Sequence, residues 1–287
     1  MRSSNRARRS ALLAAAIGLA AAALVVGALP ATAATTPAAA DRTPGYTPGP
    51  ITHPGLDHAG SEVAKHEGGS AAPSAITPNT LLNGMDVSGY QGNVNWSAAK
   101  ANGGLFAYVK ATEGTGYING YFAQQYNGSY NVGMIRGAYH FALPDRSGGA
   151  TQADYFVSHG GGWSRDGKTL PPMLDIEYNP YGSTCYGYSQ SGMRSWIQSF
   201  SNEMVARTGR YPTVYTTLDW WTTCTGNWGG LGSTNPLFIA RYSSGPGTLP
   251  AGWGFWTFWQ YADHGIFPGD QDYFNGPYDR LVALANG

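Results

Sequence analysis

The chain is poor in charged side chains and has no surplus of either sign. Asp, Glu, Lys and Arg make up 12% of its 287 residues, with 17 side chains of each sign, whereas an average domain has about 25%. Proteins that bind nucleic acid or an anionic membrane surface usually carry a surplus of positive charge. We therefore expect neither a nucleic acid nor a membrane as the main partner of the mature protein.

Long apolar runs do not occur after residue 34. The run over 11–29 follows four arginines within the first nine residues and precedes the small residues 31–34. This order is typical of a secretory signal peptide. A membrane anchor is the alternative, but the Ala-rich run and its cleavable end favour removal. We predict that residues 1–34 are a signal peptide and that the mature protein is secreted and extracellular.

Aromatic residues are also scarce in the next stretch, residues 35–79, where Tyr46 is the only one. Thr, Pro, Ala, Gly and Ser dominate this stretch, and such a composition buries too little apolar surface to offset the entropy of the chain. We interpret residues 35–79 as a propeptide or flexible leader. Its histidines, His53, His58 and His66, fit solvated side chains better than metal ligands.

Cysteine is scarce as well, since Cys185 and Cys224 are the only two. In an exported domain an even number of cysteines favours a disulfide, which stabilises by roughly 2–4 kcal/mol. A cysteine nucleophile is the alternative, and nothing else in the sequence supports it. We predict a disulfide between Cys185 and Cys224.

Nearly all aromatic residues lie in residues 80–287, which we interpret as one catalytic domain. Short apolar runs bounded by Gly or Pro alternate there with segments of helical periodicity. Strands that alternate with helices form mostly parallel sheets, and seven or more strands favour a closed barrel without edges. The last strands follow one another without long helices, so we predict an irregular TIM-like α/β barrel, with a doubly wound open sheet as the alternative. The expected strands are 82–87, 105–111, 134–141, 172–177, 211–217, 237–242 and 255–261, and the expected helices are 96–101, 121–130, 151–158, 191–207 and 278–285.

Four acidic residues stand where a parallel barrel places its working groups, at the carboxyl ends of strands and in the loops that follow. Asp86 is near the end of the first strand, and Asp175 and Glu177 end the strand over 172–177. Asp272 lies in a Gly-rich segment that we expect to be a loop after the last strand.

Asp175 and Glu177 are the most informative pair. Residues i and i+2 of a strand point to the same face, with Cα atoms about 6.5–7 Å apart. Burial and mutual repulsion would raise the pKa of one carboxyl, so that it keeps a proton near neutral pH while the other stays negative. Cleavage of a glycosidic bond uses such a pair. An acidic loop rim or a structural ion pair is the alternative for an isolated D-x-E.

Aromatic residues near these strand ends favour the sugar chemistry, because the apolar C–H faces of carbohydrate rings pack on Tyr and Trp. Any one of them is more often part of the core, but so many beside carboxylates are harder to dismiss. The set is Tyr139, Tyr178, Tyr215, Trp220, Trp221, Trp259 and Tyr261.

Five segments resemble, in order along residues 80–287, the family 25 glycoside hydrolases, which are the Chalaropsis-type and Streptomyces-type lysozymes. The chain departs from the family at Gly89-Tyr90, where relatives often have His or Asn followed by Trp or Tyr. The similar segments are Gly84-Met85-Asp86-Val87-Ser88 with Gln91-Gly92, Tyr108-Val109-Lys110-Ala111-Thr112-Glu113-Gly114, Gly137-Ala138-Tyr139-His140-Phe141, Leu174-Asp175-Ile176-Glu177 and Trp259-Gln260-Tyr261.

The resemblance implies a modified (β/α)5β3 barrel that hydrolyses the β-1,4 bond between N-acetylmuramic acid and N-acetylglucosamine in peptidoglycan, including 6-O-acetylated muramic acid in Streptomyces relatives. By position, Glu177 is then the proton donor, Asp86 and Asp175 are further catalytic acids, and Asp272 is a fourth. The residues that resemble substrate-binding groove residues are Lys110, Glu113, Tyr139, Tyr215 and Trp259.

The role of the second carboxylate has two versions. It attacks C1 directly, or it orients the acetamido oxygen of the substrate for that attack. Family resemblance implies retention of the anomeric configuration, and a D-x-E pair suits the acetamido-assisted route.

Two other functions stay open on the residues alone. A non-catalytic sugar-binding module would need the aromatics but not Glu177 and Asp175, and a chitinase-like barrel would also use a D-x-E pair.

The segment His159-Gly160-Gly161-Gly162 is similar to an esterase oxyanion loop, but no G-x-S-x-G elbow follows it. The histidines of the domain show no metal-ligand spacing. We therefore predict a monomeric muramidase without a metal or cofactor.

Overall fold

The computed structural model describes residues 42–69 and 81–287. The predicted signal peptide over 1–34 and the remaining parts of the leader lie outside the described residues. In the part that is described, no helix has the length and apolar character needed to cross a membrane.

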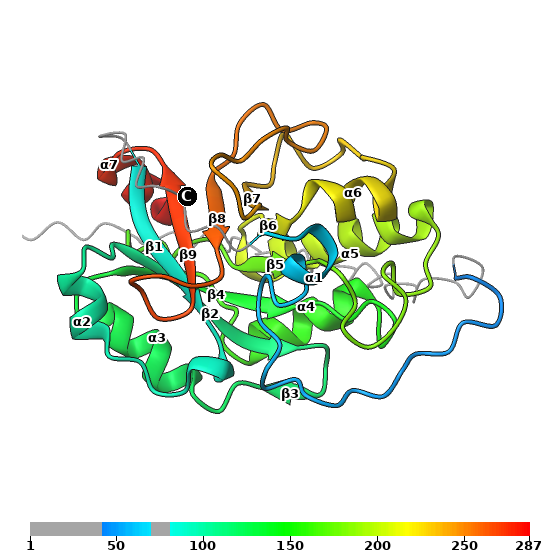
Figure 1. Ribbon diagram of the computed structural model, residues 1–287, viewed down its shortest axis with the longest axis horizontal. Coiled ribbons are helices and arrows are strands. Elements are labelled where there is room, and N and C mark those ends of the chain that lie inside the picture. Colours follow the sequence, from blue (N-terminus) through cyan, green and yellow to red (C-terminus); the bar gives the residue numbers. More distant parts are fainter. Residues whose placement is uncertain (1–41, 70–80) are drawn as a thin grey trace, which may run out of the picture. The chain divides into compact units, whose positions relative to one another are not determined.

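Eight strands close into a barrel, which confirms the predicted fold class and excludes the open sheet (Figure 1). Seven neighbouring strands pair in parallel, from the first strand through to β8, and β9 then lies antiparallel between β8 and the first strand. A short strand, β3 (Tyr117–Ile118), pairs only with β2 outside the ring. The barrel strands are β1 (Leu81–Val87), β2 (Phe106–Glu113), β4 (Ile135–Phe141), β5 (Met173–Asp175), β6 (Thr213–Thr216), β7 (Leu237–Ala240), β8 (Phe258–Ala262) and β9 (Asp270–Asn275).

Three of the helices begin at a residue whose side chain accepts a hydrogen bond from a free backbone N–H of the first turn. The side chain of Ser189 accepts a hydrogen bond from Gly192 N at the start of the longest helix, and Gly209 ends it in the left-handed conformation. Asn95 and Thr217 cap two shorter helices in the same way. The helices are α2 (Trp96–Ala101), α3 (Phe122–Asn131), α4 (Gly149–Ser158), α5 (Gln190–Thr208), α6 (Leu218–Thr225) and α7 (Tyr278–Asn286), with a 3-10 turn at Gly89–Gln91.

Several elements differ from the sequence-based expectation. Strand β5 ends at Asp175, so Glu177 lies two residues beyond the strand that we expected it to end. The segment that contains Asp272 is not a loop but strand β9, which closes the barrel by pairing with both β1 and β8. Its Gly, Asp and Gln residues have low strand propensity, and the pairing on both sides overrides that propensity. Helix α6 was also not expected, because its turns contain threonines and two tryptophans rather than strong helix formers.

Aromatic rings in tilted and edge-to-face contacts fill the barrel interior. Phe258 packs against Phe106, Tyr108 and Phe238, with ring centroids 5.2–5.4 Å apart. On the outer side, α5 and α6 carry Trp196, Phe200, Trp220 and Trp221, which are fully buried. Trp220 and Trp221 are therefore core residues, which is the more common role of such aromatics, rather than surfaces for a sugar.

The predicted disulfide is present and joins Cys185, in the loop after β5, to Cys224 on α6. Its Cα atoms are 5.2 Å apart, within the usual range for a disulfide. The bond closes a loop of 39 residues beside the barrel mouth.

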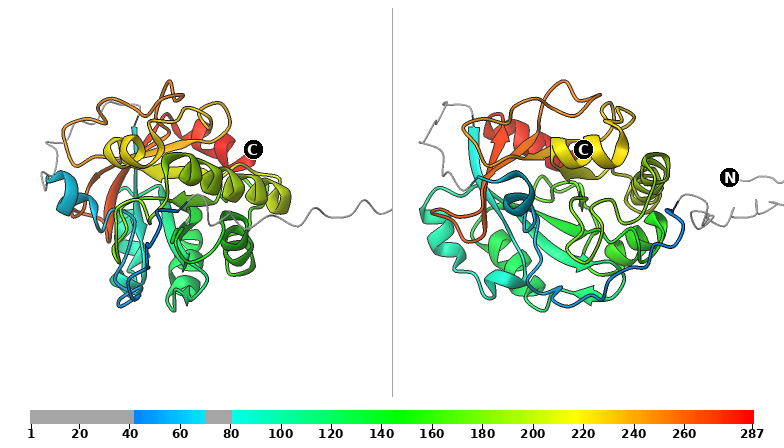
Figure 2. Two further views of the ribbon diagram at one scale, coloured as in Figure 1. Left: turned by 90° about the vertical axis from the view of Figure 1, so that its right-hand side faces the viewer. Right: turned by 45° about the vertical axis from the view of Figure 1, so that its right-hand side comes forward.

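Residues 42–69 of the leader pack against the barrel and include one short helix, α1 (Val63–Glu67) (Figures 1 and 2). Ala59 and Val63 are buried in a cluster with Tyr139, Tyr215 and Tyr242. The leader has too little apolar surface to fold by itself, but here the barrel supplies the other side of the contact. Its composition therefore did not predict its order.

Candidate active site

Five carboxylates gather at one end of the barrel interior. Asp86 is the last residue but one of β1, Asp175 ends β5, and Glu177 follows two residues later. Because β9 is antiparallel to β1, its first residue, Asp270, lies opposite Asp86, and Asp272 lies opposite Gly84, one step deeper. The exposed fraction of every one of these side chains is 2% or less. The structure thus brings the four predicted acids together and adds Asp270.

Burial raises the pKa of each carboxyl in this group, because the charged form loses its hydration. The pKa of Asp86 rises to about 7, with a hydrogen bond from Gln260 acting in the opposite direction. Burial and then the negative charge of Glu177 hold the pKa of Asp175 well above its usual range. Burial likewise holds the pKa of Glu177 high, against a hydrogen bond from the backbone of Gly60.

Several carboxylate oxygens of the group have no hydrogen-bond partner among the described residues. The oxygens without a partner include both of Asp175, both of Asp272 and Oε2 of Glu177. Buried polar atoms without partners are uncommon in folded proteins and mark places where a ligand or water completes the site. These oxygens therefore have hydrogen-bonding capacity that none of the described residues uses.

Gln260 on β8 forms hydrogen bonds with four side chains of the site. The sequence analysis did not predict a role for it. Its Nε2 donates to Asp86 Oδ2 at 2.8 Å and to Asp270 Oδ2 at 3.0 Å. Its Oε1 accepts hydrogen bonds from the hydroxyls of Tyr215 at 2.7 Å and Tyr242 at 3.1 Å. A neutral amide thus connects two acids on one side with two phenols on the other.

Trp259, the neighbour of Gln260, does not join this group. Successive residues of a strand point to opposite faces, so the inward position of Gln260 turns Trp259 away from the barrel interior. Trp259 packs on Tyr261 and Tyr273 and donates through Nε1 to Arg241 O at 2.9 Å. The structure gives no support for a groove contact by Trp259. The Trp259-Gln260-Tyr261 segment therefore lies at the site, but the residue of this segment that contacts the carboxylates is Gln260.

Lys110 and Glu113 form a buried ion pair of 2.6 Å, with neither side chain exposed. Residues three apart in a regular strand point to opposite faces. Here the register of β2 shifts between Lys110 and Thr112, and this bulge brings Lys110 and Glu113 to the same face. Burial raises the pKa of Glu113 to about 7, although the charge of Lys110 lowers it. Glu113 also accepts a hydrogen bond of 3.1 Å from Tyr181.

Tyr139 and Tyr215 complete the predicted groove residues that reach the site. Tyr139 lies on β4 and its hydroxyl accepts a hydrogen bond from Ala59 N at 3.3 Å. Tyr215 is the register partner of Asp175 on the neighbouring strand β6. Both side chains are fully buried. Of the five predicted groove residues, four therefore lie around the carboxylates, and the leader contacts two of them.

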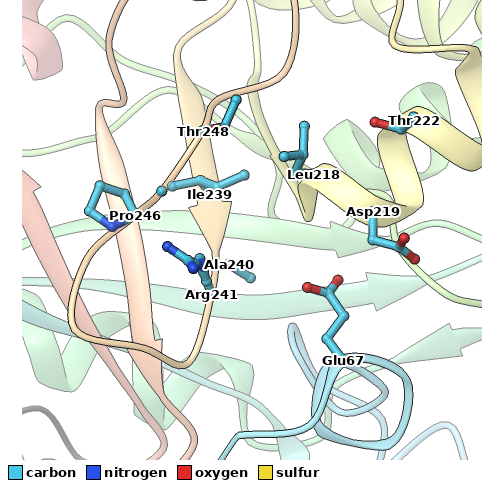
Figure 3. Close-up of a pocket in the computed structure, with 10 residues that line it drawn as sticks. Glu67, Leu218, Asp219, Thr222, Ile239, Ala240, Arg241, Pro246 and Thr248 are labelled. Atoms are coloured by element: carbon cyan, nitrogen blue, oxygen red, sulfur yellow. The ribbon is translucent and has the colours of Figure 1, made fainter.

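A cavity of about 480 Å³ opens beside the leader (Figure 3). Glu67 of the leader and Asp219 of α6 point toward one another in it, and both accept from the hydroxyl of Tyr178, at 2.7 and 2.8 Å. Arg241 and Pro246 line the other side. The lining combines these charged side chains with apolar ones, Leu218 and Ile239 among them.

Metal ligation has no support in the described part of the chain. Within residues 42–69 and 81–287, no group of three or more His, Cys, Asp or Glu side chains is placed to hold a metal ion. His140 of the domain instead bonds to Thr112 and Gln152, at 2.8 and 2.9 Å, and its burial lowers its pKa to about 4.

Comparison with known proteins gives consistent matches. The model of glycosyl hydrolases family 25 matches residues 85–270. The chain is 47% identical over 248 residues to Lysozyme M1 of Streptomyces globisporus, which covers 83% of this chain and 84% of the relative. It is 48% identical over 210 residues to an N,O-diacetylmuramidase of Chalaropsis sp, covering 72% of this chain and all of the relative.

Solved structures match as well. A family 25 lysozyme from Aspergillus fumigatus has a TM-score of 0.71 and 52% identity, and covers 72% of this chain and 100% of its own. That share equals the length of the barrel, residues 81–287, whereas the match to Lysozyme M1 is longer than the barrel and must continue into the leader. The family model, the identities and the shared barrel together show that this chain belongs to glycosyl hydrolase family 25 and is a glycosidase.

Proposed function

We propose that the protein is a secreted muramidase that hydrolyses the β-1,4 bond between N-acetylmuramic acid and N-acetylglucosamine in peptidoglycan strands. The observation that carries this proposal is the buried pair Asp175 and Glu177, both with raised pKa and with carboxylate oxygens that no described residue satisfies. A sugar-binding module would not need two buried acids in this state.

Glu177 acts first as the acid in this proposal. Its raised pKa keeps the carboxyl protonated near neutral pH, so it donates a proton to the glycosidic oxygen as the C1–O bond breaks. The same group, now ionised, removes a proton from the water that attacks C1 in the second step. The reaction consumes one water molecule and leaves both sugars with free hydroxyls.

Asp175 supports the acetamido-assisted route between these steps. Both of its oxygens lack partners, so one of them can accept the N–H of the substrate acetamide. That hydrogen bond makes the acetamide oxygen more nucleophilic toward C1 and stabilises the positive charge that follows. Two inversions at C1 retain the anomeric configuration.

The remaining acids and the groove residues assist this reaction. Negative charge on Asp86 raises the pKa of Glu177 and so favours its protonated form, and Asp270 and Asp272 lie beside Asp86 on β9. Lys110, Glu113, Tyr139 and Tyr215 present hydrogen-bonding groups to the sugars. The relatives named N,O-diacetylmuramidase, at 48% and 49% identity, support acceptance of O-acetylated muramic acid.

Digestion of purified peptidoglycan by residues 81–287 tests the proposal. We expect new reducing ends on N-acetylmuramic acid, and NMR of the first product should show the retained anomer. New reducing ends on N-acetylglucosamine would indicate the other glycosidic bond, and an inverted anomer would exclude both versions of the mechanism. Walls with and without chemical de-O-acetylation test the acetylated substrate.

A further inference from the structure

We propose that residues 53–67 of the leader are an intramolecular inhibitor that fills the substrate groove of the uncut protein and must leave before a glycan can bind. The inference rests on the site assigned under the proposed function. It concerns a peptide ligand of the groove, supplied by the same chain.

The segment reaches the proton donor itself. Gly60 N donates a hydrogen bond of 2.6 Å to Oε1 of Glu177, a residue 117 positions later in the chain. This oxygen is one of the two atoms that could pass a proton to a glycosidic oxygen. While the amide occupies it, a sugar cannot approach the carboxyl from that side.

The backbone of the segment also uses the polar groups of the groove. Lys110 Nζ donates to Asp57 O at 2.7 Å and to Pro54 O at 3.0 Å. Both backbone groups of Ala59 form hydrogen bonds with the groove. Its N–H donates to the hydroxyl of Tyr139, and its carbonyl accepts from Gln260 Nε2 at 2.9 Å. An N-acetyl sugar carries the same amide group, so the segment satisfies donors and acceptors that a glycan would otherwise use.

Rings of the leader cover aromatic side chains near the site. His66 stacks on Tyr178 with centroids 4.0 Å apart and an interplanar angle of 3°. His58 stacks on Tyr90 at 5.4 Å. Aromatic faces of this kind are the surfaces on which sugar rings pack. Apolar burial of Val63 and Ala59 adds to the docking.

The leader is anchored at a second place, upstream of the groove. Tyr46 donates to Asp145 at 2.7 Å, and the guanidinium of Arg42 lies 5.0 Å from the ring centroid of Tyr188. Arg146 donates to the carbonyl of Gly49. Two anchors on one chain raise the effective concentration of the segment at the groove.

A related barrel has a chain no longer than residues 81–287, so we expect this barrel to fold without the leader. The structure of the Aspergillus fumigatus lysozyme matches over all of its chain, with a length equal to residues 81–287. Docking therefore has a role other than completing the core. Hydrolysis of one peptide bond between residues 69 and 81 by an endopeptidase, with uptake of one water molecule, would convert the tethered segment into a peptide that can dissociate.

Gly60 provides a selective way to displace the segment. Its φ is +92°, and a Cβ there would lie 2.5 Å from Gln260 Oε1, 2.9 Å from Tyr215 Oη and closer still to Tyr242 Oη. Gly45 has a similar φ of +81° but open space around the position of a Cβ. Gly60→Ala and Gly45→Ala therefore share the backbone strain, and only the first clashes with the groove.

The test compares release of soluble fragments from dye-labelled peptidoglycan by residues 35–287 as wild type, Gly60→Ala and Gly45→Ala, with residues 81–287 as the reference. We expect the wild type and Gly45→Ala to be at least about tenfold slower than the reference, and Gly60→Ala to recover about tenfold. Equal rates for residues 35–287 and 81–287 would overturn the inference. So would a Gly60→Ala rate no higher than that of Gly45→Ala.

A binding measurement separates this inference from the proposed function. Titration calorimetry of a synthetic peptide, residues 42–69, into residues 81–287 needs no enzymatic activity. If the reference does not cut peptidoglycan, the proposed function fails, and saturable binding weakened by Gly60→Ala still supports the docking. No binding by the wild-type peptide would refute it.

Discussion

Asp86 and Asp270 are direct partners across the antiparallel strands β1 and β9, and both accept from the same nitrogen, Gln260 Nε2. A neutral amide that faces two buried acids does not compensate two negative charges. The pKa of Asp86 accordingly rises to about 7, and burial followed by the charge of Asp86 holds that of Asp270 well above its usual range. The hydrogen bond from Gln260 therefore opposes the rise in the pKa of Asp86 without cancelling it.

Changing Gln260 to Glu should lower kcat/KM of residues 81–287 by about tenfold to a hundredfold. The change replaces the shared donor by a third carboxyl and leaves Asp86 and Asp270 without a partner, which costs about 1–3 kcal/mol for each buried group. Initial rates on soluble peptidoglycan fragments measure the effect. Gln124→Glu, at an exposed amide whose side-chain hydrogen bonds go only to the backbone of Val94, serves as the control. An unchanged rate in Gln260→Glu would contradict a role for this amide.

Glu177→Gln should reduce kcat by about 10²–10⁴, because the amide cannot donate the proton that the leaving oxygen needs. Binding of an uncut glycan should persist, since the side chain keeps its size. Glu203→Gln is the matched control, as Glu203 lies on α5 beside Asp154 and Arg207. Wall lysis at the wild-type rate by Glu177→Gln would show that another residue is the donor.

The buried acids should make the uncut protein less stable as pH rises through neutrality. Asp86 and Glu113 have a pKa of about 7 when folded, above their unfolded values near 4. Their stabilising contribution is complete below about pH 4 and is lost as the pH rises through 7. His140 acts in the opposite sense, because its pKa is lowered to about 4 and its contribution returns as pH rises toward 6.5.

Above about pH 6.5 His140 is mostly neutral in both the folded and the unfolded protein, so only the buried acids change the free energy of unfolding there. From there to about pH 8 we expect the free energy of unfolding to decrease, by at most about 1.4 kcal/mol per pH unit for each group. Urea denaturation at several pH values measures it. Asp86→Asn should make the decrease shallower, and a stability that rises over this range would rule the explanation out.

Loss of the Cys185–Cys224 disulfide should lower the free energy of unfolding by about 3–4 kcal/mol, the chain-entropy value for a closed loop of 39 residues. The double variant Cys185→Ala and Cys224→Ala, compared with the oxidised wild type in guanidinium, tests this. We expect kcat at 25 °C to change little, because neither cysteine contacts the carboxylate group. A difference below about 1 kcal/mol would mean that the loop is already restrained in the unfolded chain.

Local patterns predicted most of the strand and helix order of the barrel and drew attention to the proposed catalytic pair, Asp175 and Glu177. The period of two in a strand predicts that Asp175 and Glu177 share a face, and runs bounded by Gly or Pro located seven of the eight barrel strands. These properties depend on neighbours within a few residues. Asp86 was predicted for the same reason, since it lies near the end of the first strand.

The rest depended on contacts between residues distant in sequence. Strand β9, and with it Asp270, is defined by pairing with β1 and β8 rather than by its composition. The bulge in β2 decided that Lys110 meets Glu113, and the inward face of β8 selected Gln260 instead of Trp259. The leader looked unable to fold because its own apolar surface is small, and it is ordered because the barrel buries that surface from the other side. Periodicity is a local property of the sequence, whereas burial and pairing arise only when distant segments meet.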